Sequence, residues 1–125
     1  MSNISSVAFD LLTDQAMYEK LKTNYFMRQY KLSYRMWYNL MACWAIEQES
    51  PVRPYSINDV KGSLLFLYRK GLIGYGTIAL EDGKEVKSSR ITGEGITLVQ
   101  HVFHAVIRAF PQHLDCLLNW GMKLE

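Results

Sequence analysis

Hydrophobic residues recur along most of this chain every three or four positions, the spacing that places side chains on one face of an α-helix. Residues 4–22 show this spacing over one or two short helices. Residues 25–48 contain neither proline nor glycine and are predicted to form the longest helix. Pro51 ends that helix, because the residue before a proline is displaced from helical backbone angles. The first 50 residues are therefore predicted to be helical.

The next segment combines an extended connection with a second amphipathic helix. Residues 51–54 carry a proline at each end and are predicted to be extended. Ser56, three residues before an aspartate, resembles a capping box and predicts a helix start. Gly71 is suited to follow the last turn of this helix. The inward positions recur at i, i+4 and i+7 and are Val60, Leu64 and Leu67.

Two β-prone runs follow this helix, at residues 77–80 and 85–91. The glycines of segment 74–76 are expected to break the chain before the first strand. The Asp82-Gly83 pair predicts a two-residue turn of type I′ between the strands, because these residues readily adopt positive φ angles. The pattern therefore predicts an antiparallel hairpin.

Helical spacing returns after the hairpin. Thr92 is placed to cap a long helix over residues 93–110, and Pro111 separates it from a short helix over residues 112–123. The apolar face of the long helix is predicted to consist of Ile96, Val99, Val102, Phe103, Val106 and Phe110. The predicted fold class is mostly α with a small β-hairpin, an α+β domain.

Length and composition favour a single soluble domain over residues 1–125. No apolar run approaches the roughly 20 residues that span a bilayer, and the N-terminal segment lacks the basic start of a signal peptide. Cys43 and Cys116 both lie in apolar helical context, which favours a reducing compartment over a disulfide scaffold. The expected location is the cytoplasm, without membrane contact.

Positive charge is concentrated in the middle of the chain. The formal net charge is only +2, but residues 53–90 hold seven basic and four acidic side chains. The basic excess therefore coincides with the predicted helix and hairpin, which favours contact with a polyanion over that stretch.

The order of these elements resembles the winged helix-turn-helix superfamily, most nearly its MarR-like and PadR-like DNA-binding regulators. The resemblance covers about 45 residues and implies a winged helix with extra helices at both ends: residues 1–50, then helix and wing over 56–92, then residues 93–125. The matching segments are the inward positions of the helix, its stop at Gly71-Leu72-Ile73, the hairpin tip Asp82-Gly83-Lys84, and the opening of the next helix at Ile91-Thr92-Gly93-Glu94-Gly95.

The resemblance implies that the helix enters the major groove of duplex DNA while the hairpin follows the backbone or the adjacent minor groove. Basic side chains would neutralise phosphates, and hydroxyl groups, Ser89 among them, would donate to phosphate oxygens. An ordinary solvated hairpin is the alternative for these lysines. The residues expected to contact DNA are Lys61, Ser63, Arg69, Lys84, Lys87, Ser88 and Arg90.

The function that the resemblance implies is a dimeric transcriptional regulator, with the terminal helices forming the dimer so that two half-sites are read. The chain departs from the family between Glu47 and Ile57, where too few residues remain for a full second helix and turn. It also presents Leu65 and Phe66 where regulators present polar side chains. A winged helix repurposed as a protein-interaction module, docking through this pair, is therefore the alternative; a plasmid or phage replication or segregation accessory factor is another.

Aromatic and histidine residues are assigned to structure rather than to chemistry. The stripe Tyr30, Tyr34, Trp37 and Trp44 has helical core spacing and predicts core or dimer contacts, in preference to stacking on unpaired bases. His101, His104, His113 and Cys116 have the three-residue spacing of a helical ligand pair, but no metal site is predicted from them. No catalytic or nucleotide-binding motif occurs, so neither an enzyme nor a cofactor is expected.

Overall fold

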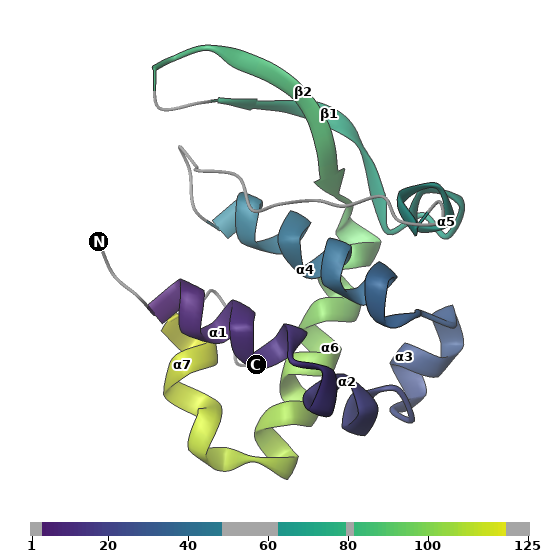
Figure 1. The fold of residues 1–125 in the computed structure, drawn as a ribbon, viewed down its shortest axis with the longest axis vertical. Helices are drawn as coiled ribbons and strands as arrows, with labels where there is room; N and C mark the ends of the chain where they lie inside the picture. The colour runs from purple at the N-terminus through teal and green to yellow at the C-terminus, as the bar shows by residue number, and fades with distance from the viewer. Residues whose placement is uncertain (1–3, 49–62, 80–81, 120–125) are drawn as a thin grey trace.

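The computed structural model describes residues 4–48, 63–79 and 82–119 (Figure 1). Within these ranges the chain is mostly helical and carries one two-stranded antiparallel sheet, so the predicted α+β class is confirmed. The elements are α1 (Ile4–Thr13), α2 (Gln15–Leu21), α3 (Tyr25–Tyr30), α4 (Tyr34–Gln48), α5 (Ser63–Arg69), β1 (Ile73–Ala79), β2 (Glu85–Ile91), α6 (Gly93–Ala109), η2 (Pro111–His113, a 3₁₀ turn) and α7 (Leu114–Asn119).

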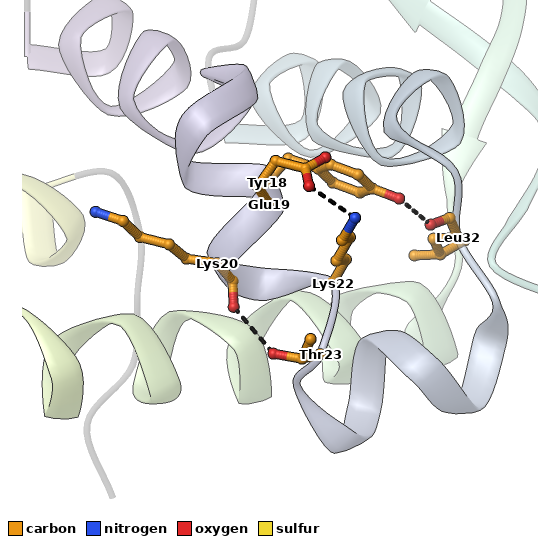
Figure 2. Close-up of polar contacts among 6 residues, drawn as sticks. All are labelled: Tyr18, Glu19, Lys20, Lys22, Thr23 and Leu32. Carbon is orange, nitrogen blue, oxygen red and sulfur yellow. Dashed lines mark hydrogen bonds and ion pairs between the residues drawn. The ribbon is translucent and has the colours of Figure 1, made fainter.

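The N-terminal region forms two short helices, one of the two forms predicted for residues 4–22. Asp14 separates them, and its carboxylate accepts a hydrogen bond from the backbone N–H of Met17 at 3.1 Å, which caps α2. Figure 2 shows the contacts of this helix: the hydroxyl of Tyr18 donates to the carbonyl of Leu32 at 2.7 Å. That bond ties α2 to the segment that leads into α4.

The prediction of one helix over residues 25–48 is wrong, because the chain turns between α3 and α4. Lys31 adopts the left-handed conformation, with φ 53° and ψ 48°. The hydroxyl of Ser33 then accepts from the N–H of Met36 at 3.2 Å and starts α4. A left-handed lysine costs roughly 1–2 kcal/mol. Burial of Leu32, together with the hydrogen bond to its carbonyl, holds the turn in place.

The core lies between α4 and the helices that cover it. Trp37 and Trp44 are fully buried, as predicted for the aromatic stripe. The indole N–H of Trp37 donates to the carbonyl of Leu12 at 2.8 Å, and the Trp44 ring meets Phe103 of α6 edge to face. The large apolar area that these two rings bury makes them strong contributors to stability.

Helix α6 confirms most of its predicted apolar face. Ile96, however, is 38% exposed, so its assignment to the core is wrong. Leu98, which was not predicted to face the core, is buried instead. The buried side chains of α6 are Leu98, Val99, Val102, Phe103 and Val106.

The hairpin is longer than predicted. β1 begins at Ile73 rather than at residue 77, and β2 spans Glu85–Ile91 as predicted. Segment 74–76 does not break the chain, because its residues pair with residues 88–90 across the sheet. Glycine weakens a strand but does not prevent pairing when the partner strand is in place.

The turn of the hairpin also differs from the prediction. Ala79 pairs with Glu85, whereas a two-residue loop at Asp82-Gly83 would pair it with residue 86. Gly83 has φ +84°, as expected after aspartate, but Asp82 has no positive φ, so the turn is not of type I′. The carboxylate of Asp82 accepts from the N–H of Lys84 at 3.0 Å and shapes the tip.

Several predictions fall outside the described residues. These are the extended connection at 51–54, the helix start at Ser56, the inward position Val60 and the last residues of the terminal helix. The described part of that terminal helix is η2 followed by α7. In the segments that the structure describes, no helix has the length and apolar character to cross a bilayer.

Candidate nucleic-acid interface

The candidate site begins at the joint between α5 and β1. Gly71 has φ +76°; its N–H bonds to the carbonyl of Tyr68 at 3.0 Å, and the N–H of Leu72 bonds to the carbonyl of Leu67 at 3.1 Å. This pair of bonds is the Schellman motif, and Leu67 and Leu72 are both fully buried beside it. The predicted helix stop at Gly71 is confirmed. The joint sets the direction in which the hairpin leaves α5.

Thr92 ties the far end of the hairpin back to this joint. Its hydroxyl donates to the carbonyl of Gly71 at 2.6 Å and accepts from the N–H of Gly95 at 3.1 Å, so it also caps α6 as predicted. Its own N–H donates to the carbonyl of Leu72 at 3.0 Å. One threonine therefore holds together the end of α5, the start of β1, the end of β2 and the start of α6.

The outer side of α5 presents a mixed surface. Leu65 is 49% exposed and Phe66 is 45% exposed, as predicted, and Arg69 is exposed one turn further along the helix. Leu67 is fully buried and Leu64 is partly buried against the core, in agreement with their predicted inward positions. An apolar pair followed by a guanidinium is the chemistry that α5 offers to a partner.

The expectation that Ser63 contacts DNA is wrong for this fold. Its side chain is 3% exposed, and its hydroxyl accepts a hydrogen bond from the side-chain amide of Asn39 on α4 at 2.7 Å. A serine at the start of a helix that packs on a second helix satisfies a buried polar group there instead of facing solvent. Lys61 lies outside the described residues. Of the three residues predicted on this helix, Arg69 is the one found exposed.

The register divides the predicted wing residues between two faces. Residues alternate along each strand and cross-strand partners share a face, so Thr77 and its partner Lys87 lie on the face of Ile73 and Ile91. Arg90 pairs with Gly74 on the opposite face. Positions 87 and 90 therefore lie on opposite faces of the hairpin, whereas a single row of phosphate contacts requires both on one face.

The hairpin residues on the second face pack closely. The position of a Cβ on Gly76 would lie 2.5 Å from Cδ of Arg90, so the Arg90 stem crosses this glycine while the residue remains exposed. Ser88 is the cross-strand partner of Gly76, and its side chain lies outside the described part. At the tip, Lys84 is exposed and its ammonium lies 3.9 Å from the Asp82 carboxylate. A surface pair of this kind contributes little stability and leaves the ammonium open to other anions.

An aromatic cluster joins α5 to the first face of the hairpin, and the sequence reasoning missed it. Tyr75 stacks on Tyr68 with 4.5 Å between ring centroids and 26° between planes. The hydroxyl of Tyr68 shares a 2.7 Å hydrogen bond with the hydroxyl of Ser89, so Ser89 is engaged within the fold instead of facing phosphate as predicted. Burial raises the pKa of Tyr68 above its ordinary value, while the Ser89 contact opposes that rise. The signal available in the sequence was an aromatic residue, Tyr75, flanked by two glycines, which have no side chains that could cover its ring.

A second feature of the described surface lies away from the hairpin. A hollow of about 300 Å³ lies beside α2, but its two tyrosine hydroxyls already donate to backbone carbonyls, those of Leu32 and Thr13. Within the described ranges, no three His, Cys, Asp or Glu side chains lie close enough together to hold a metal ion. His101 instead stacks on Phe26 at 4.2 Å between centroids.

Comparison with known proteins adds nothing to this picture: no family model, curated protein or solved structure matches the chain.

Proposed function

We propose that this chain is a winged-helix protein that binds duplex DNA through α5 and the β1–β2 hairpin. The observation that supports the proposal most is the joint at Gly71, closed by Thr92, which places the hairpin next to α5, where it runs over α4 (Figure 1). Both elements lie at one end of the molecule, as helix and wing do when they straddle a groove.

The charges at this end suit a polyanion. Arg69 on α5, Lys84 at the hairpin tip and Arg90 on β2 are exposed, and each carries a cationic group of the kind that contacts phosphate oxygens. Contacts of this kind release counterions and supply most sequence-independent affinity. The buried Ser63 removes one predicted base contact, so we expect backbone contacts to dominate over base reading.

The protein acts, within this proposal, as a dimeric transcriptional regulator in the cytoplasm. Two copies related by a two-fold axis would read two half-sites, which compensates for the small footprint of one helix and one wing. A replication or segregation accessory factor would use the same DNA contacts, and the two roles differ in which DNA site is occupied.

The test is a titration of mixed-sequence duplex DNA at several salt concentrations. The variant Arg69→Ala/Lys84→Ala/Arg90→Ala should bind all duplexes more weakly. The slope of log affinity against log salt should become shallower by roughly one unit for each lost phosphate contact. Equal binding by the variant and the parent would show that this end of the molecule is not the DNA surface.

A control variant removes the same charge at the other end of the molecule. Lys20, Lys22 and Arg28 are exposed on or beside α2 and α3, away from the hairpin (Figure 1). The triple alanine variant of these residues should keep the parent's affinity and salt slope. A loss as large as that of the first variant would attribute the binding to net charge alone.

A second candidate function is docking of a protein partner on α5, which the exposure of Leu65 and Phe66 favours. Exposed apolar pairs on a helix often mark a contact surface. Leu65→Ser/Phe66→Ser should leave the fold and dimer intact and reduce DNA affinity modestly if α5 serves DNA. If association is lost in light scattering while the variant stays folded, α5 serves a protein contact instead.

A further inference from the structure

Tyr75 is the most exposed large hydrophobic side chain among the described residues, at 84% exposure. It stands in the middle of β1, on the same face of the hairpin as the buried Ile73 and Ile91. A single exposed aromatic residue is ordinary on a protein surface. Tyr75 differs because its ring is held in a defined orientation by the residues behind it.

The ring rests on a support formed by residues of two other elements, α5 and β2. Tyr68 of α5 lies beneath it in a stacked arrangement, with 4.5 Å between centroids. The Tyr68 hydroxyl is in turn fastened at 2.7 Å to Ser89 of β2, which is the cross-strand partner of Tyr75. One face of the Tyr75 ring is therefore covered by Tyr68. Since 84% of the residue is exposed, its other face lies open to solvent.

We propose that Tyr75 is a stacking site for an unpaired nucleobase of bound DNA. The inference rests on the proposed contact of α5 and the hairpin with DNA. Bases stack on aromatic side chains in the offset parallel arrangement that Tyr68 and Tyr75 already adopt, and the interaction is tolerant of sequence because every base has a π face. The occupant is a base outside the double helix, since a paired base has both faces covered by its neighbours.

The surroundings of Tyr75 fit a nucleic-acid strand. Arg69 is exposed next to Tyr68 on α5, and position 87 of β2, a lysine, lies on the same hairpin face two residues beyond Ser89. A strand whose base stacks on Tyr75 would have its phosphates near basic positions on either side. An aromatic ring with basic neighbours is the usual make-up of single-strand binding surfaces.

The experiment measures binding of three probes: an oligothymidylate of about 12 nucleotides, a fully paired duplex of mixed sequence, and the same duplex with one bulged thymidine. Tyr75→Leu should weaken binding of the oligothymidylate and of the bulged duplex by about tenfold to a hundredfold. Its binding of the paired duplex should stay within about twofold, since no base is free to stack there. Tyr75→Phe should bind all three probes like the parent, because the ring is retained.

Tyr25→Leu is the matched control, because Tyr25 is 69% exposed but lies on α3, away from the hairpin. It should leave all three affinities unchanged. If Tyr75→Leu binds the oligothymidylate and the bulged duplex like the parent while duplex binding persists, the stacking site is refuted and the proposed function stands. Single-strand binding that depends on Tyr75, without any duplex binding, would refute the duplex proposal and support the stacking site. A parent protein that binds none of the probes overturns both.

Discussion

Replacing Gly95 with alanine should destabilise the protein, although the same change in most helices is favourable. Gly95 lies in the first turn of α6, where the helix crosses the start of β1. The position of a Cβ on this residue lies 2.3 Å from the carbonyl oxygen of Leu72 and 2.7 Å from Cγ1 of Ile91. Real Cβ atoms essentially never approach other atoms closer than 3.0 Å, so α6 or the strand would have to move.

Two effects of opposite sign decide the magnitude. Alanine is favoured over glycine by roughly 1 kcal/mol within a helix. Overpacking typically costs about 1–3 kcal/mol and more when backbone must shift. Here the obstructing atom is a carbonyl oxygen that accepts from the N–H of Thr92, so moving it also weakens the bond that closes the joint. We therefore expect a net loss of about 2 kcal/mol in the free energy of unfolding.

Urea unfolding followed by circular dichroism measures this loss, and with an m value of about 2 kcal/mol per molar the midpoint should fall by about 1 M. Gly93→Ala is the matched control, two residues earlier on α6. Its Cβ would meet nothing within 4 Å, so this variant should equal the parent or exceed it by a few tenths of a kcal/mol. If Gly95→Ala proves as stable as Gly93→Ala, α6 does not pass this close to β1, and the account of the joint is refuted.

Three further predictions concern caps, backbone strain and pH. Thr92→Val should lower the free energy of unfolding by about 1–2 kcal/mol in urea titrations, because the helix cap and the bond to the α5 terminus are both lost. Lys31→Gly should raise the midpoint of thermal unfolding, with a gain of about 0.5–1 kcal/mol, since glycine adopts the left-handed conformation without strain; an unchanged or lower midpoint would contradict the strained turn. Burial raises the pKa of Tyr18 and of Tyr34 above their ordinary 10.0, so the fold favours their protonated forms. Their contribution is fully present below pH 10 and is lost as the pH rises above that value through the raised pKa values, so urea midpoints should decline there and decline less in the Tyr18→Phe/Tyr34→Phe variant.

Elements whose signal lies in a residue's own chemistry could be predicted from the sequence. Gly71 ends α5 because glycine tolerates the positive φ that the turn requires, and Thr92 caps α6 because its hydroxyl reaches an N–H three residues on. The extent of β2 and the exposure of Leu65 and Phe66 also follow from local patterns of alternation and helical spacing. For the candidate site, the sequence therefore predicts the end of α5, the second strand of the hairpin, the cap of α6 and the exposed pair Leu65 and Phe66.

Contacts between distant parts of the chain decided the rest. The sequence around Lys31 contains no helix breaker, and the turn forms there because Leu32 is buried and bonded to α2. Ser63 reads as a polar residue on an open helix face, but packing against Asn39 of α4 buries it. The ring of Tyr75 has a defined orientation only because α5 places the ring of Tyr68 against it. Local patterns report which conformations a residue tolerates and which side of an element it occupies. Only tertiary packing determines which partner it meets there, because that depends on segments far away in the chain.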